Sequence, residues 1–220
     1  MLDKLNLTDY NYCCKVKITN GGVFMRLGDL ADISTGLVIN RKAADVIDTN
    51  IKKYKLLTLK SFDDDGWIND EFIDLFNSSE VLSDKYLTTN RDLVIRLTSP
   101  YTCIPITEDT EGLLVPSQFA LIRITDKSVN PYYLAYALNS ETIRMDYVRT
   151  SLGATIPVIR VATLRATRIP IPNLRKQEIV ANIWELKTKQ KKLYHQLIHA
   201  IEEKDKQIEI RIMEEIENGK

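Results

Sequence analysis

The sequence predicts an α+β fold, in which one mixed and mainly β domain over residues 1–172 is followed by a long C-terminal coiled-coil helix over residues 173–220. Short β-rich runs bounded by Gly, Pro, Asn or Asp recur in the first part, as expected for strands joined by turns. After the proline-containing segment 168–174, the stretch from Arg175 to Glu217 holds no Pro and no Gly, which favours one continuous helix. The 220 residues suit one domain with an appendage, or two small domains.

Each predicted element of the first part carries its own local signal. Residues 27–33 space their leucine and isoleucine side chains as in one or two helical turns. Residues 130–148 predict a helix, because an Asn cap precedes Pro131 at an early helical position, and Asn139-Ser140 can divide it into two. The expected strands are the apolar runs at 54–59, 92–98, 112–124 and 155–164.

The C-terminal helix carries a stripe of apolar residues that predicts a partner. If it is fully helical it is about 64 Å long at ~1.5 Å per residue. The apolar residues fit the a and d positions of a coiled coil, with Gln190 in one a position and a stutter between Leu197 and Ile201. Such a stripe is buried either against another helix or against the chain's own domain, and the length favours pairing with another helix. The stripe consists of Ile179, Ile183, Leu186, Leu193, Leu197, Ile201, Ile208 and Ile212.

Composition and charge exclude several classes of protein. Thirty Lys and Arg balance thirty Asp and Glu, so bulk attraction to DNA in the manner of a histone is not expected. Three cysteines, two of them adjacent, make a poor disulfide framework and favour a reducing, cytoplasmic setting. No apolar run approaches the ~18 residues of a membrane span and the first residues lack a signal-peptide core, so no membrane association is expected.

Catalytic and cofactor motifs are absent from the sequence, so no catalytic, cofactor-binding or metal-binding residue is predicted. The only histidines, His195 and His199, have the i, i+4 spacing of metal ligands, but polar positions on a long helix are the favoured explanation. An acidic cluster suits a hard metal ion, yet its DDDGW core has strong turn chemistry, and a turn is favoured. The cluster consists of Asp63, Asp64, Asp65, Asp70 and Glu71.

The neutral total charge hides two basic segments. Residues 41–60 and residues 144–168 each have a local excess of +4, whereas residues 61–92 between them have an excess of −7. If the two basic segments meet in space, they form a positive patch on a neutral protein, which is typical of a protein that reads a DNA groove. The alternative is a solvated face with scattered charge, and charge alone does not separate the two.

Five motifs, in order along the chain, carry a resemblance to one family. They are the Leu-Gly-Asp helix that leads into a strand and a Gly at 25–36, the YKLLTLKSFDDDGWIN segment at 54–69, the LTTNRDLVIRLTSP strand at 87–100, the strand and helix at 115–124 and 130–140, and the IPIP segment with the following helix start within 152–183. The third departs from the family pattern, because Asn90-Arg91 replace the usual Gly. With these motifs, the chain resembles the DNA-specificity (S) subunit of type I restriction-modification enzymes, in a half-length form with a single target recognition domain.

The resemblance implies a non-catalytic subunit that binds double-stranded DNA. In that family each recognition domain reads one half of a split site, and the long helix fixes the distance to a second domain. Methyltransferase (M) subunits bring S-adenosylmethionine, and a restriction (R) subunit brings ATP-driven cleavage. Because only one unit occurs here, a homodimer with antiparallel helices is expected, and pairing with a different S-like chain is the alternative. An adaptor that binds no DNA and assembles through its coiled coil, and a carboxylate–metal enzyme, are the rival functions.

Three loops are expected to contact DNA: one after Gly36, one after the strand at 92–98, and the turn at 149–155. Arg can donate two hydrogen bonds to guanine and Asn can bind adenine, whereas Lys mainly contacts phosphate. Arg96 and Arg160 have an alternative role in structural ion pairs. The expected DNA-binding residues are Asn40, Arg41, Lys42, Lys60, Arg96, Ser99, Tyr101, Arg144, Arg149, Thr150, Thr155 and Arg160.

Overall fold

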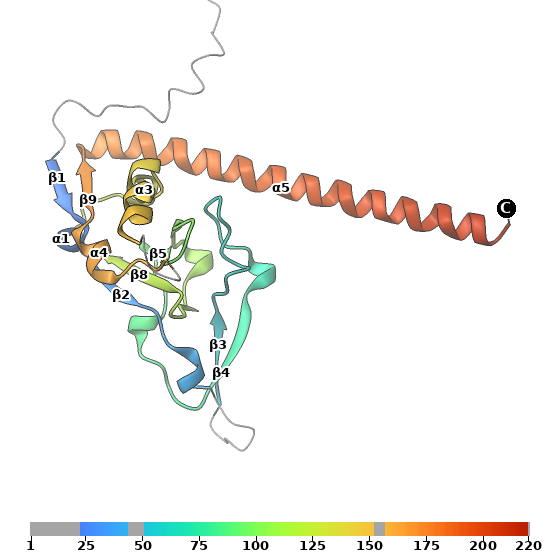
Figure 1. Cartoon of the computed structure of the whole chain (residues 1–220), viewed down its shortest axis with the longest axis horizontal. Coiled ribbons are helices and arrows are strands. Elements are labelled where there is room, and N and C mark those ends of the chain that lie inside the picture. Colours follow the sequence, from blue (N-terminus) through green and yellow to red (C-terminus); the bar gives the residue numbers. More distant parts are fainter. Residues whose placement is uncertain (1–22, 44–50, 152–156, 220) are drawn as a thin grey trace, which may run out of the picture.

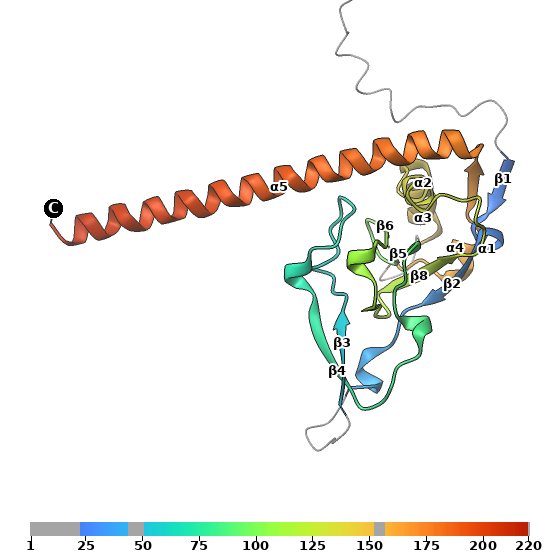
Figure 2. The same ribbon diagram turned by 180° about the vertical axis from the view of Figure 1, so that it is seen from behind.

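The computed structural model describes residues 23–43, 51–151 and 157–219, and it confirms the predicted α+β class (Figure 1). A β-rich domain lies along the first part of one long helix, which continues well past the domain in both views (Figures 1 and 2). Within the described parts of the chain, no helix is both long and apolar enough to cross a membrane.

Four antiparallel strands form the central sheet. In the order in which they pair, they are β2 (Ala31–Thr35), β8 (Phe119–Ile124), β5 (Asp92–Arg96) and β6 (Cys103–Pro105). Side chains alternate across a strand, so Leu93 and Ile95 of β5 enter one core cluster while Val94 enters the cluster on the other face. Both faces of β5 are therefore buried, which explains its continuous apolar run.

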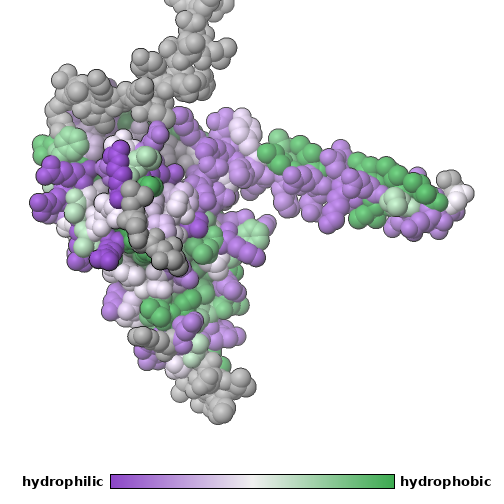
Figure 3. Space-filling model, in the orientation of Figure 1, coloured by the Kyte–Doolittle hydropathy of each residue, from purple (hydrophilic) through white to green (hydrophobic). Residues whose placement is uncertain are grey.

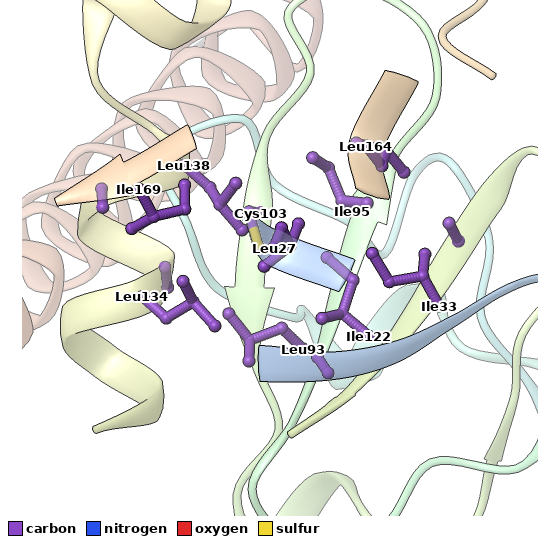
Figure 4. Close-up of a cluster of buried hydrophobic side chains, with 14 of the residues drawn as sticks. Leu27, Ile33, Leu93, Ile95, Cys103, Ile122, Leu134, Leu138, Leu164 and Ile169 are labelled. Atoms are coloured by element: carbon purple, nitrogen blue, oxygen red, sulfur yellow. The ribbon is translucent and has the colours of Figure 1, made fainter. Parts of the chain in front are cut away.

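The larger core cluster lies between this sheet and the helices. Figure 4 shows Leu93 and Ile122 of the sheet near Leu134 of α2 (Pro131–Leu138). All three side chains are fully buried. Each contributes about 1.5–3 kcal/mol relative to an exposed position, so this cluster is a main source of the domain's stability.

A smaller sheet adjoins the central one. In order, its strands are β4 (Asp74–Ser78), β3 (Lys52–Leu56) and β7 (Leu113–Leu114), with β3 antiparallel to β4 and parallel to β7. It has its own small cluster, which includes Leu37, Phe76 and Leu114. Gly36 leads from β2 into this region, and only a glycine fits there because an added Cβ would lie 2.3 Å from the carbonyl oxygen of Pro116.

A two-stranded ribbon joins the two ends of the domain. In it, β1 (Val23–Arg26) pairs antiparallel with β9 (Arg168–Ile171), next to the short helices α1 (Leu27–Leu30) and α4 (Val161–Ala166). Arg165 of α4 donates a hydrogen bond of 2.8 Å to the carbonyl oxygen of Ile33, at the outer edge of β2. The remaining elements are α3 (Glu141–Thr150) and 3-10 turns at Ile39–Arg41, Asp70–Phe72, Asp84–Tyr86 and Glu108–Thr110.

Several predicted elements are confirmed and others need correction. The run expected as one strand at 112–124 forms two strands, β7 and β8. The helix expected at 130–148 is α2 and α3, divided at Asn139-Ser140, and Asn130 caps α2 by accepting hydrogen bonds from two backbone N–H groups. Of the strand expected at 155–164, residues 155 and 156 lie outside the described residues, and the rest is wrong: Val158 makes only an isolated β-bridge, and α4 begins at Val161. There Leu164 packs in the core from a helix, so tertiary packing overrides the local β preference. The helical turns expected at 27–33 end at Leu30, where β2 begins.

The predicted C-terminal helix is confirmed as α5 (Leu174–Glu217), whose 44 residues span about 66 Å at ~1.5 Å per residue. Asn173 caps its start, as predicted, by accepting a hydrogen bond of 3.0 Å from the backbone N–H of Lys176. Gln177 anchors its first turns with a side chain that is only 2% exposed. That side chain accepts from the backbone N–H of Asn130 at 2.9 Å and donates to the carbonyl oxygens of Ser128 and Pro172 at 3.2 and 3.0 Å.

Gln177→Ala is expected to lower the free energy of unfolding by about 2–3 kcal/mol, because it removes the partners of one N–H and two carbonyl groups. The matched control is Gln207→Ala on the same helix, where the side chain is exposed and lies outside the apolar stripe, and the expected change is below about 0.5 kcal/mol. Urea denaturation followed by circular dichroism measures both. Equal losses in the two variants would contradict the anchoring role of Gln177.

Candidate nucleic-acid interface

The long helix packs on the domain with one face only. The contacting positions recur every three or four residues, which is the period of one helix face. Gln177 and Ala181 are buried there, and Trp184 is partly buried against the larger core cluster. The contacting residues are Gln177, Ala181, Trp184, Thr188, Lys191 and His195. Every described residue of α5 beyond His195 is exposed, so the domain covers only the first half of the helix.

The predicted coiled-coil stripe lies on the opposite face of α5. Ile179 follows Gln177 and Ile183 follows Ala181 by two positions, and two residues turn a helix by about 200°. All members of the stripe are between 44% and 68% exposed. Figure 3 shows hydrophobic groups along the part of the helix that extends past the domain. The alternative in which the stripe folds back on its own domain is therefore wrong, and pairing with another chain stays a prediction.

The acidic segment DDDGW forms the turn that its sequence predicts. The backbone N–H of Gly66 donates to the carbonyl oxygen of Asp63 at 3.1 Å, and that of Asp63 donates to Trp67 at 3.0 Å. The Asp63 carboxylate also accepts from the backbone N–H of Asp65 at 2.8 Å. Gly66 has a φ of 107°, which glycine adopts without strain. In the three described stretches, no three His, Cys, Asp or Glu side chains are grouped so that they could hold a metal ion.

Two of the predicted DNA-binding arginines lie in a polar network that contacts this turn. Arg96 donates to the Asp64 carboxylate at 3.2 Å, so its alternative role in an ion pair is the one observed. Arg144 donates to the side chains of Asn139 at 2.8 Å and Thr102 at 3.3 Å. Burial lowers the pKa of the Arg144 guanidinium, whereas nearby acidic groups oppose that shift. Both guanidinium groups therefore serve contacts inside the domain.

Asn139 connects this network to the edge of the central sheet. Its side-chain amide donates to the carbonyl oxygen of Cys103 at 2.7 Å and accepts from the backbone N–H of Cys103 at 2.9 Å. The amide thus satisfies the backbone of β6 as a neighbouring strand would. Burial raises the pKa of the Cys103 thiol, which keeps it protonated.

Tyr101 is a correction to the predicted set, because it lies in the core and not at the surface. Its side chain is 2% exposed, and its ring meets that of Tyr147 edge to face with the centroids 5.8 Å apart. Burial also raises the pKa of Tyr147, whose hydroxyl shares a hydrogen bond of 3.0 Å with the side chain of Thr167. The ring of Tyr101 therefore packs against the domain's own residues and offers no face to DNA.

The structure brings the second predicted loop next to Val158 and Ile159, which follow the third predicted loop in the chain; residues 152–155 of that loop lie outside the described residues. Thr98 and Val158 form a β-bridge, and the backbone N–H of Ile159 donates to the carbonyl oxygen of Leu97 at 2.8 Å. We call this contact the Thr98–Val158 junction. Ser99 and Arg160 are the exposed polar residues next to this junction in the chain, whereas Arg149 and Thr150 are exposed at the end of α3. Arg149 is paired with Asp146 at 3.1 Å, but both side chains are well solvated, so this pair is weak and exchangeable.

The first predicted loop lies near Lys60. Asn40 is exposed in the 3-10 turn, and Lys42 pairs with Glu80. Ile39 and the exposed Lys60 line one cavity of about 440 Å³. The side chain of Arg41 and the whole of Thr155 lie outside the described residues.

The residues that seat α5 on the turn are not among those predicted from the sequence. A Cβ on Gly66 would lie 3.3 Å from a ring carbon of Trp184, so the turn approaches the helix closely. The ring of Trp67 meets that of His195 edge on, with the centroids 5.2 Å apart. The available signal was the pair of tryptophans itself, because the chain has only two and Trp184 falls outside the apolar stripe.

The fold is shared with two solved structures. The chain is similar to the HsdS subunit from Thermoanaerobacter tengcongensis, with a TM-score of 0.55 and 15% identity over 80% of this chain and 39% of that one. It is also similar to a chain from a structure that describes complex assembly and conformational transition of a type I R-M system, with a TM-score of 0.54 and 16% identity over 84% of this chain and 46% of that one. The chain thus spans less than half the length of either.

The sequence itself shows the family. No significantly similar protein was found among curated proteins. A family model described as the type I restriction modification DNA specificity domain matches residues 21–203, which include the domain and most of α5. From this match over most of its length, the chain belongs to the family of type I restriction modification DNA specificity domains.

Proposed function

We propose that this chain is the DNA-recognition subunit of a type I restriction-modification complex and has no catalytic step of its own. The strongest support is the family match over residues 21–203. The exposed Ser99 and Arg160 beside the Thr98–Val158 junction, and the exposed Arg149 and Thr150 at the end of α3, have the donors that phosphates and base edges accept. In the assembly, methyltransferase subunits bring S-adenosylmethionine and a restriction subunit, where present, brings ATP-driven cleavage, so this chain needs no cofactor.

One chain reads one half of a split site, and a second copy reads the other half. The apolar stripe points away from the domain, so it is available to pair with the α5 of a second copy. Antiparallel pairing puts one domain at each end of the helix pair, and a two-fold axis relates them. Two identical readers related in this way recognise an interrupted palindrome. Pairing with a different S-like chain would give an asymmetric site.

Replacing Leu193 and Leu197 together by Lys is expected to convert a dimer into a monomer, because it puts two charges into the centre of the stripe. Light scattering at micromolar concentration measures the mass. The control is Ile210→Lys, which adds a charge to an equally exposed isoleucine that is not part of the stripe and is expected to leave the mass unchanged. A monomeric unmodified protein would contradict the pairing.

Selection from random duplex DNA, with and without a methyltransferase partner, is expected to enrich a consensus of two half-sites separated by bases of no fixed identity. This outcome follows because each domain reads only the bases it reaches, while the helix pair spans the gap. No enrichment would favour the adaptor. Metal-dependent cleavage of the DNA would favour an enzyme.

Arg149→Ala and Arg160→Ala are each expected to weaken DNA binding by about fivefold to 150-fold, the range that 1–3 kcal/mol per lost contact implies. Fluorescence anisotropy with the selected duplex measures the affinity, and circular dichroism checks that helix content is unchanged. Arg175→Ala removes an equal charge from the exposed start of α5 and serves as the control. Affinity unchanged in both test variants would remove the end of α3 and the junction from the interface, and Arg41→Ala then tests the first loop.

A further inference from the structure

The turn at residues 63–67 holds α5 at a second point, well beyond the buried anchor. Asp65 forms an ion pair with Lys191, and its carboxylate also lies 3.4 Å from the Nε2 of His195. Trp67, 9% exposed, presents its ring to the imidazole of His195. Charge pairing and ring packing thus meet the helix within about one turn of its length.

This turn is stiff, because its contacts tie it to the core of the domain. The backbone carbonyl of Asp64 accepts a hydrogen bond of 3.2 Å from the side chain of Thr102, which is fully buried next to β6. The Asp64 carboxylate accepts from Arg96 of β5, so two neighbouring segments of the central sheet hold the turn. A force on α5 at Lys191 is therefore transmitted to the sheet and not absorbed by a loose loop.

The direction of a rod is fixed better by contacts spread along it than by contacts near one end. The core holds α5 at Gln177, Ala181 and Trp184, and the turn extends this support as far as His195. The separation of Gln177 and His195 is about 27 Å at ~1.5 Å per residue. The end of α5 at Glu217 lies about 60 Å from Gln177 on the same rise. A pivot of about 10° at the anchor would move that end by about 10 Å, which corresponds to ~3 base pairs at 3.4 Å each. The spacing between two DNA half-sites is therefore sensitive to a few degrees at the turn.

We propose that the turn at residues 63–67 is a brace that determines spacing: by holding α5 at Lys191 and His195, it sets the number of base pairs between the two half-sites. The inference rests on the proposed pairing and split-site reading. Asp65 acts as a positioning residue, since it touches the helix and not the DNA. The Asp65–Lys191 pair is largely solvated, and such pairs add little to stability. Its loss is therefore expected to change direction and not folding.

The first test measures spacer preference with charge variants. Asp65→Lys puts a cation against Lys191, and the double variant Asp65→Lys with Lys191→Asp restores the attraction with the charges exchanged. The control, Glu141→Lys, makes the same charge change at an exposed position in the first turn of α3. The probe is a set of duplexes that carry the half-sites selected by the unmodified protein, separated by spacers of different lengths.

The unmodified protein is expected to favour one spacer by about tenfold over its neighbours, comparable with the cost of one mismatched base pair. Asp65→Lys is expected to reduce that ratio to about threefold or less with the half-site bases unchanged, and the charge exchange to restore it. Glu141→Lys is expected to keep the full ratio. An Asp65→Lys protein with the spacer ratio of the unmodified protein would overturn the brace.

The second test needs no DNA, so it separates failure of the brace from failure of the proposed function. Spin labels on cysteines at Asn77, in β4, which extends away from α5 (Figure 1), and at Glu214 report the angle between domain and helix. Cys13 and Cys14 are replaced by Ser, and the fully buried Cys103 stays unlabelled. Labelled chains are diluted with unlabelled ones, so that only distances within one chain are counted.

Pulsed electron paramagnetic resonance is expected to give a narrow distance distribution between the labels for the unmodified protein and a broad one for Asp65→Lys. The double variant with exchanged charges is expected to give a narrow distribution again. Equal widths in all three overturn the brace whatever DNA is selected. A broadened Asp65→Lys distribution in a protein that selects no split site supports the brace as a mechanical link and overturns the split-site reading.

Discussion

The burial of one face of α5 against the domain is the constraint on which the other features depend. A helix of this length needs tertiary contacts to be stable, and its first half obtains them from the core around Gln177 and Trp184. The same contact sets the rotation of the helix about its own axis. Because the apolar stripe follows the buried positions by two residues, it must face outward. The rotation of the helix about its axis therefore accounts for both its attachment to the domain and the exposure of the stripe.

The charge available for DNA is smaller than the basic segments of the sequence suggest. In the segment 144–168, Arg144 is occupied in the network that contacts the turn, and Arg165 donates to a backbone carbonyl of β2. In the earlier basic segment, Lys42 is paired with Glu80. The exposed cations that remain, among them Arg149 and Arg160, suit a reader with weak bulk attraction to DNA. Such a protein depends on a few well-placed contacts and on its partner subunits for affinity.

Local chemistry explains which features the sequence predicts well. The caps at Asn130 and Asn173, the break at Asn139-Ser140 and the DDDGW turn depend on neighbours within a few residues, and all are confirmed. The strand expected at 155–164 fails because Leu164 meets the core from a helix, a contact made by residues distant in the chain.

The residues of the candidate site also differ in whether nearby or distant parts of the chain determine them. Arg149 and Arg160 are exposed to solvent, as a DNA contact requires. The burial of Tyr101, in contrast, depends on Tyr147 of α3, which lies far from it in the sequence. The turn was predicted from its own residues, whereas its contact with Lys191 joins segments more than a hundred residues apart. No periodicity or spacing in the sequence reports such a contact.

The amide of Asn139 also bears on how the chain avoids unwanted assembly. Sheet edges with free backbone groups can template the addition of a strand from another molecule. At one edge of the central sheet, Asn139 occupies both backbone groups of Cys103, and at the other edge the guanidinium of Arg165 covers the carbonyl of Ile33. Two side chains thus discourage strand exchange at both borders of the sheet. A protein whose long helix exposes an apolar stripe can then associate through that helix without also polymerising through its sheet.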